Sequence, residues 1–165
     1  MKQKRNLSPG RPAARAQHLY HYTRAEWADS ILREGVIRTT VPNLRPPTDL
    51  EEVEVLLSRG FVQIEAGSPS VVWLTSEDRP GSGDDHGLPQ EKRAVRIAVD
   101  VGAQPWNRWA PRQKNYDKQW VRHLGRVGGG KSSTWHVHTN PIAMRDVVEV
   151  RDLITNHVLY SRGAE

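Results

Sequence analysis

Apolar and polar positions follow first the pattern of a strand and then that of a helix. Residues 18–22 (HLYHY) form a short aromatic run that is typical of a strand. The following segment carries apolar side chains at helical spacing: Trp27, Ala28, Ile31 and Leu32. Gly35 comes next, and glycine is the usual residue just past the end of a helix. We therefore expect a strand, a helix and then an extended segment over residues 36–40.

Two capping boxes indicate where helices begin. In residues 23–26 (TRAE), Thr23 is the expected N-cap and Glu26 stands three positions later, so that each side chain can bond to the backbone N–H of the other residue. Residues 48–51 (TDLE) repeat this pattern, and apolar residues at helical spacing follow them as far as Gly60. The first part of the chain therefore predicts two short helices.

Most of the remaining chain has the pattern of strands. Runs rich in β-branched or aromatic residues cover 71–75, 94–101, 134–138, 147–150 and 157–160. Residues 113–124 place apolar side chains at helical spacing, and residues 79–90 have the composition of a loop. We expect one α+β domain over residues 18–165, with a mixed or antiparallel sheet as its core, two short N-terminal helices and a basic helical insertion.

Composition excludes several classes of protein. The chain has no cysteine, which excludes disulfides, thiolate nucleophiles and zinc sites with cysteine ligands. No stretch approaches the roughly 18 consecutive apolar residues of a membrane span, and no apolar segment follows the basic N-terminus. We therefore expect a cytoplasmic protein without a membrane partner. Residues 1–17 carry five basic side chains and no acidic one, and they predict a disordered basic arm.

Charge is distributed unevenly over the predicted domain. The net charge of the chain is +5, but without the five basic residues of the arm 19 basic residues face 19 acidic ones. Residues 49–91 are strongly acidic, whereas residues 105–131 hold seven basic side chains, one acidic one and four aromatic rings. Basic side chains among aromatic rings are typical of nucleic-acid surfaces, although a helix with its rings inward and its charges solvated has the same pattern. The candidate nucleic-acid-binding residues are Arg108, Arg112, Lys118, Trp120, Arg122 and Lys131.

Two motifs for phosphate or metal binding are incomplete. Residues 125–132 (GRVGGGKS) have the spacing of a P-loop, but a P-loop joins a buried strand to a helix, whereas here a predicted helix precedes the motif and a predicted strand follows it. A flexible glycine loop is the favoured interpretation. His136 and His138 share one face of a predicted strand, and His86 is a possible third metal ligand that nothing in the spacing requires. We expect no metal.

Histidines can also act without a metal, as the acid and the base of RNA cleavage. His136 with His138 is one such pair, and His21 with Arg96 holding a phosphate is another arrangement. A packed strand histidine with a hydrogen-bonded ring explains His21 equally well, and the helix cap explains Thr23. A metal-independent RNase stays open as an alternative function.

Several segments taken together resemble the ADP-ribosyltransferase fold, in particular small bacterial and phage enzymes that modify DNA or RNA. Residues 19–37 (LYHYTRAEWADSILREGVI) are similar to the aromatic-rich histidine strand of that family and the helix that follows it. Residues 71–76 (VVWLTS) are similar to a later strand beside the nicotinamide ribose. Residues 134–150 resemble its late strands, with a W-x-V pattern, Pro-Ile and a closing strand. The similar segments cover roughly half of the chain.

The resemblance implies an enzyme that uses NAD as a substrate and transfers ADP-ribose to a nucleic-acid or protein acceptor. It implies that His21 hydrogen-bonds the ribose of NAD, that Thr75 and Ser76 line the nicotinamide end, and that Tyr22 or Trp73 stacks on the nicotinamide ring. The complete set of candidate site residues for such an enzyme comprises His21, Thr75, Ser76, Arg96, Thr134 and His136 for catalysis, and Tyr22, Thr23, Trp73 and Trp135 for binding NAD. Arg96 belongs to this set because it is a charged residue within an otherwise apolar strand.

The chain departs from this family at one position. The family commonly has a catalytic glutamate just before the late strand, and Thr134 occupies the equivalent position here. Threonine cannot act as a carboxylate, so that another acid such as Asp100 or Glu149 takes over, or the chemistry differs, or the fold serves for binding alone. The last possibility is a non-catalytic module, such as an inhibitor or an accessory factor, that binds nucleic acid or protein.

Overall fold

The computed structural model describes most of the expected domain. The described residues are 18–40, 69–79, 90–114, 116–126 and 131–163, without the side chains of Gln90, Trp120 and Lys131. Three of the predictions above lie outside them: the arm over residues 1–17, the second capping box with its helix over residues 48–60, and the loop between Arg79 and Gln90.

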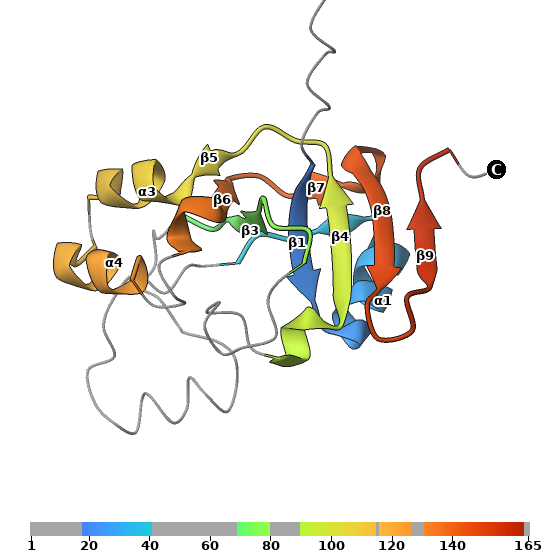
Figure 1. Cartoon of the computed structure of the whole chain (residues 1–165). Coiled ribbons are helices and arrows are strands. Elements are labelled where there is room, and N and C mark those ends of the chain that lie inside the picture. The colour runs from blue at the N-terminus through green and yellow to red at the C-terminus, as the bar shows by residue number, and fades with distance from the viewer. Residues whose placement is uncertain (1–17, 41–68, 80–89, 115, 127–130, 164–165) are drawn as a thin grey trace, which may run out of the picture.

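A seven-stranded sheet forms the centre of the molecule (Figure 1). The order of its strands is β5-β6-β3-β1-β4-β8-β9, and every pair of neighbours is antiparallel. The strands are β1 (Leu19–Thr23), β3 (Val72–Thr75), β4 (Val95–Val99), β5 (Gln104–Pro105), β6 (Trp135–His138), β8 (Val147–Asp152) and β9 (Val158–Ser161). The expected α+β class with an antiparallel sheet is confirmed, because each strand-like run of the sequence forms a strand.

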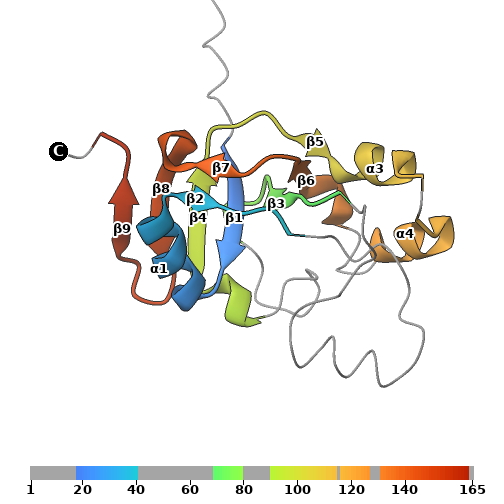
Figure 2. The ribbon, with the colours of Figure 1, turned by 180° about the vertical axis from the view of Figure 1, so that it is seen from behind.

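Short elements surround this sheet. Strands β2 (Val36–Ile37) and β7 (Ile142–Ala143) form a separate antiparallel pair. The helices are α1 (Ala25–Glu34), α3 (Trp106–Trp109) and α4 (Lys118–Leu124), and the 3-10 turns are η2 (Gln90–Arg93), η3 (Ala110–Arg112), η4 (Lys131–Thr134) and η5 (Met144–Asp146). Figure 2 shows α1 and the β2–β7 pair on one face of the sheet. Helices α3 and α4 lie together at the end of the sheet that carries β5 and β6 (Figures 1 and 2).

Helix α1 ends where the sequence predicts but begins differently. Gly35 adopts a left-handed conformation with φ 73°, and its N–H donates to the Ile31 carbonyl, as expected of a glycine that ends a helix. The prediction of Thr23 as the N-cap is wrong, because Arg24 occupies that position without a side-chain capping bond. Thr23 is the last residue of β1, opposite Val95, and is only 2% exposed. Strand pairing therefore takes the residue that the capping pattern assigned to the helix.

The basic segment is also organised differently from the prediction. A helix was expected over residues 113–124, but α4 begins only at Lys118. Helix α3 was not predicted, because its four residues are too few to show a helical period. The glycine-rich residues 125–132 stand between helix α4 and strand β6, and the last two of them belong to η4, which is not the strand-then-helix context of a P-loop.

Two clusters of buried residues hold these elements together. The aliphatic core lies between the sheet, α1 and the β2–β7 pair, and its buried residues are Ala28, Ile37, Val72, Leu74, Val95, Ile97, Val99, Ile142, Val147 and Val150. The tryptophan core lies at the α3–α4 end, where Trp73, Tyr116, Leu124 and Trp135 pack against buried Val71, Trp106, Trp109, Ala110, Val121 and Val137.

In the part of the chain that the structure describes, no helix is both long enough and apolar enough to cross a membrane.

Candidate functional site

The strand register assigns the candidate site residues to the two faces of the sheet. Residues directly opposite one another on neighbouring strands share a face, and successive residues along a strand alternate between faces. We call the face that carries α1 the helix face, and the opposite one, which is turned to the viewer in Figure 1, the front face. By this register the front face carries Tyr20, Tyr22, Trp73, Thr75, Arg96, Trp135, Glu149 and Arg151.

Strands β1 and β3 separate close to these residues. They pair at Tyr20 and Thr75, whereas β1 pairs with β4 along all five of its residues. Where β1 and β3 part, the His21 ring Nδ1–H donates to the Trp73 carbonyl at 3.0 Å and so replaces a bond of the ladder. Burial lowers the pKa of His21, which keeps the ring neutral. This contact belongs to the packed and hydrogen-bonded histidine that the sequence left open as an alternative.

Two threonine hydroxyls meet at the end of β3. The Oγ1 atoms of Thr75 and Thr134 lie 3.3 Å apart, although the two residues are 59 positions apart in the chain. The Ser76 N–H donates to the Thr134 carbonyl at 3.0 Å, and the Glu77 N–H donates to Thr75 Oγ1 at 3.2 Å. The structure thus brings together Thr75, Ser76 and Thr134, three hydroxyl residues of the candidate site, and it adds Glu77 beside them.

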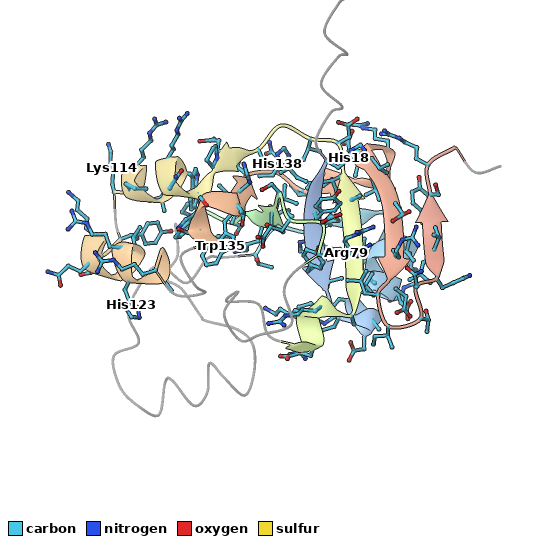
Figure 3. All side chains as sticks on the ribbon, in the orientation of Figure 1. His18, Arg79, Lys114, His123, Trp135 and His138 are labelled. Carbon is cyan, nitrogen blue, oxygen red and sulfur yellow. The ribbon has the colours of Figure 1, made fainter. Side chains whose placement is uncertain are left out.

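Residues 76–79 then cross in front of β1 and β4. The Tyr22 hydroxyl donates to the Glu77 carbonyl at 2.9 Å, and Arg96 Nη1 donates to the Asp78 carbonyl at 2.9 Å. Burial raises the pKa of Tyr22, so its hydroxyl keeps its proton at neutral pH. Figure 3 shows Arg79 on this side of the sheet, over β1 and β4. Tyr22 is only 7% exposed, so its ring packs inside the protein and its hydroxyl holds this segment.

Arg96 belongs to a charged network on the front face. Its Nη2 lies 3.1 Å from a carboxylate oxygen of Glu149, and Arg151 holds both oxygens of the same carboxylate at 2.9 and 2.7 Å. Hydrogen bonds from Arg151 in the first place, and from Arg96, lower the pKa of Glu149 and keep it ionised. The Arg96 guanidinium also lies 5.2 Å from the ring centroid of Tyr20. The sequence analysis did not single out Tyr20, although its spacing of two from Tyr22 on a strand indicates a shared face.

The two candidate tryptophans lie at the boundary with the tryptophan core. The Trp73 ring centroid is 4.9 Å from that of Trp106, and the Trp73 and Trp135 rings meet edge to face at 6.4 Å. Both Trp73 and Trp135 are partly buried, and Figure 3 shows Trp135 at the side of the sheet next to α4. Trp73 therefore contributes to packing, and Trp135 lies next to the threonine pair, because it stands opposite Thr75.

Three of the candidate residues belong to the helix face. His21 stands opposite Ile97, Thr23 opposite Val95, and His136 opposite Leu74, all three partners being in the aliphatic core. The structure thus places His21, Thr23 and His136 on the other side of the sheet from Thr75 and Arg96. His21 reaches the separation of β1 and β3 through its bond to the Trp73 carbonyl.

The histidines considered for metal binding or RNA cleavage bond to the backbone. His136 Nδ1–H donates to the Thr134 carbonyl at 2.9 Å, and His138 Nδ1–H donates to the Gly102 carbonyl at 2.8 Å. Only the Nε2 atom of each ring is left for other chemistry. No group of three or more acidic or histidine side chains within the described ranges is arranged to hold a metal ion, and His86 lies outside those ranges.

The acids considered in place of the missing glutamate differ in their positions. Asp100 follows β4, is exposed, and lies 3.5 Å from Arg162 near the β8–β9 end. Glu149 lies on the front face, but two arginines bind its oxygens. Glu77, which the sequence analysis missed, directly follows the Thr75-Ser76 pair, and its backbone bonds to the Thr75 hydroxyl. Its position just past the end of a strand that carries site residues is the signal that could have identified it.

The candidate nucleic-acid residues lie apart from this group. Arg108, Arg112, Lys118 and Arg122 are exposed on α3, η3 and α4, whereas Trp106 and Trp109 between them are buried. The interpretation with rings inward and charges solvated is therefore confirmed for these two tryptophans. Figure 3 shows Lys114 pointing away from the helices. The side chains of Trp120 and Lys131 are outside the description.

Comparison with known proteins identifies no relative of this chain. No model of a protein family matches it, and neither the curated proteins nor the solved structures contain a significant match. The resemblance to ADP-ribosyltransferases therefore depends on the segments of the sequence described above.

Proposed function

We propose that this protein is an ADP-ribosyltransferase-like enzyme that uses NAD as a substrate on the front face of the sheet, beside β1 and β3. The observation that carries the proposal is the hydroxyl pair of Thr75 and Thr134, 3.3 Å apart, on the face that also holds Arg96. These residues come from β3, β4 and the turn η4, which are far apart in the sequence. Thr75 and Thr134 also occupy positions that the family resemblance assigns to the NAD site.

The residues of this face have chemistry that suits the parts of NAD. Ribose hydroxyls need partners that both donate and accept, which the Thr75 and Thr134 hydroxyls can do. A pyrophosphate needs a fixed cation, and the Arg96 guanidinium is held by the Asp78 carbonyl and Glu149. A nicotinamide ring needs an aromatic surface, which the partly buried Trp135 can provide.

The transfer breaks the bond between the ribose C1 atom and the nicotinamide nitrogen. The electron pair of this bond leaves with nicotinamide, the nucleophile of the acceptor bonds to C1, and the proton of that nucleophile passes to a base or to water. Positive charge develops on the ribose as the bond breaks, and a carboxylate nearby stabilises it. Thr134 has no carboxylate and cannot supply the negative charge that this stabilisation needs. We assign the role to Glu77, because it is the acidic residue next to the hydroxyl pair and its N–H donates to Thr75 Oγ1 at 3.2 Å.

Two acidic residues that are neighbours in the chain provide a matched test. NAD binding is measured by calorimetry, and turnover is measured as release of nicotinamide, with water accepting the ADP-ribose when no other acceptor is present. We expect Glu77→Gln to bind NAD as the unchanged protein does and to release nicotinamide ~100-fold more slowly, the loss typical of one removed electrostatic group. We expect Asp78→Asn to have normal turnover, because Asp78 contributes its backbone carbonyl to Arg96.

A further variant tests whether the hydroxyl pair of Thr75 and Thr134 contributes to NAD binding. Thr75→Val keeps the shape of the side chain and removes the hydroxyl that bonds to Thr134, so we expect weaker NAD binding in a protein that remains folded. No heat of NAD binding to the unchanged protein would contradict the proposed function. Equal turnover of Glu77→Gln and Asp78→Asn would contradict the assignment of Glu77 alone.

A further inference from the structure

The exposed surface of α3, η3 and α4 is strongly basic. We call it the basic surface, and its described and exposed cations are Arg108, Arg112, Lys114, Lys118, Arg122 and Arg126. Asp117 is the one acidic residue in the whole sequence between positions 105 and 131. Positive charges this close together raise the local potential, which attracts polyanions.

The two tryptophan rings of α3 are not available to a ligand. Trp106 is 2% exposed and Trp109 is 4% exposed, and both pack into the tryptophan core with Val71 and Val137. Arg108 stands between these two rings in the sequence and is exposed. The helix therefore directs its rings to the sheet and its cation to solvent, and at these positions no ring remains on which a base could stack.

Cations at the opposite end of the molecule have acidic partners. Arg38 pairs with Glu34, Arg162 lies 3.5 Å from Asp100, and Arg151 holds Glu149 with two bonds. Such partners neutralise much of the charge at that end. The basic surface has six described cations and Asp117, so it keeps a net positive charge that a partner can use.

We infer that the basic surface binds duplex nucleic acid through its phosphates, without reading the sequence of bases. A duplex carries one negative charge for about every 1.7 Å of its length, which suits exposed cations on short neighbouring helices. Proteins that prefer single strands rely on exposed aromatic rings, and the rings of α3 are buried. For the transferase proposed above, the duplex is the acceptor of ADP-ribose, and this part rests on the proposed function. The binding of the duplex itself requires no NAD.

The test compares two variants of the full chain that lose equal charge. The first replaces Arg108, Arg112, Lys118 and Arg122 by Gln, and the control replaces Arg33, Arg38, Arg145 and Arg162, which are at the opposite end. Both variants keep the basic residues 1–17, so any contribution of that segment is the same in both. Fluorescence anisotropy with a labelled duplex of arbitrary sequence, between 50 and 200 mM salt and without NAD, reports the affinity.

We expect the affinity of the unchanged protein for the duplex to fall ~100-fold over this range of salt, if about four phosphates are contacted. The slope of log affinity against log salt should be smaller by about 3 to 4 in the first variant and nearly unchanged in the control. A third variant, which combines Arg108→Lys, Arg112→Lys and Arg122→Lys, should keep its binding, because a phosphate accepts either cation. Thermal unfolding confirms that each variant is folded.

Several results would overturn the inference. One is equal duplex affinity of the first variant and the control, and another is tighter binding to the single strand than to the duplex. Binding to anionic lipid vesicles without binding to the duplex would identify a different partner. None of these results depends on NAD, so the inference and the proposed transferase can fail separately.

Discussion

The two ends of the sheet are built from different side chains. At the end with β4 and β8, β-branched residues such as Ile97 and Val150 pack under α1. At the end with β3 and β6, Trp73, Trp106 and Trp135 pack against one another with centroids 4.9 to 6.4 Å apart. Charged groups differ in the same way, because arginines meet carboxylates around β8, whereas cations greatly outnumber acids on α3 and α4.

This difference indicates that one end of the sheet mainly stabilises the fold, whereas the other end also presents charges to a partner. An aliphatic core with paired surface charges stabilises a fold but offers few groups to a ligand. An aromatic core under a surface of one charge stabilises its end of the sheet and leaves the cations to bind a partner. The candidate site lies at the boundary between the two ends, where β1 and β3 separate and the Thr75 and Thr134 hydroxyls meet.

The largest expected effect comes from removing a ring of the tryptophan core. Trp106→Ala should lower the free energy of unfolding by about 3 to 5 kcal/mol, because it leaves a cavity between Trp73 and Trp109. Urea unfolding measures this loss. Trp27→Ala is the matched control, because Trp27 is 38% exposed, and we expect a change below about 1 kcal/mol there. Similar losses in both variants would show that the tryptophan core does not depend on Trp106.

A smaller effect is expected at the β8 end. Glu149→Gln removes the carboxylate between Arg96 and Arg151 and should cost about 1 to 2 kcal/mol, since the group is partly solvated. Because the pKa of Glu149 is lowered in the folded state, its contribution is present above the unfolded value of about 4.3 and is lost as pH falls through the lower folded value. Urea unfolding should show a smaller difference between variant and parent at pH 3 than at pH 7.

The smallest effect concerns His21 and depends on pH. Its folded pKa lies below the unfolded value of about 6.5, so the unfolded state takes up the proton first, and stability is lost as pH falls below that value. The contribution of this one group is at most about 1.4 kcal/mol per pH unit. His21→Asn retains an N–H for the Trp73 carbonyl but does not titrate. Its unfolding free energy should therefore change less than that of the parent between pH 7 and pH 5, and equal changes would contradict the structural role of this ring.

Much of the fold was predictable from the sequence, and the errors have identifiable causes. The β-branched runs over residues 71–75 and 94–101 became β3 and β4, because their side chains are buried on a pleated surface. Thr23 was misassigned because the capping pattern is local and strand pairing with β4 overrides it. Helix α3 was missed because four residues show no period, and its two tryptophans are recognisable as core only once β6 lies beneath them.

The candidate site was predictable as a set of residues but not as an arrangement. Thr75, Arg96 and Thr134 were named from short segments, and no local pattern shows that the two hydroxyls meet or that Arg96 holds the Asp78 carbonyl. Glu77 and Tyr20 were missed for the same reason. Their relevance comes from contacts with other strands, since Tyr22 on β1 donates to the Glu77 carbonyl and Arg96 on β4 lies over the Tyr20 ring, and these contacts depend on the register of the sheet.

The sequence by itself determined the α+β class, the positions of the long strands, the end of α1 at Gly35 and the excess of cations over residues 105–131. These features depend on side-chain periodicity, backbone preference and charge, which are local properties of the chain. Only the tertiary structure decided which face of the sheet each candidate residue occupies, and that Trp106 and Trp109 turn inward while Arg108 stays exposed. These outcomes follow from strand order, strand register and burial, which are set by contacts between residues far apart in the chain.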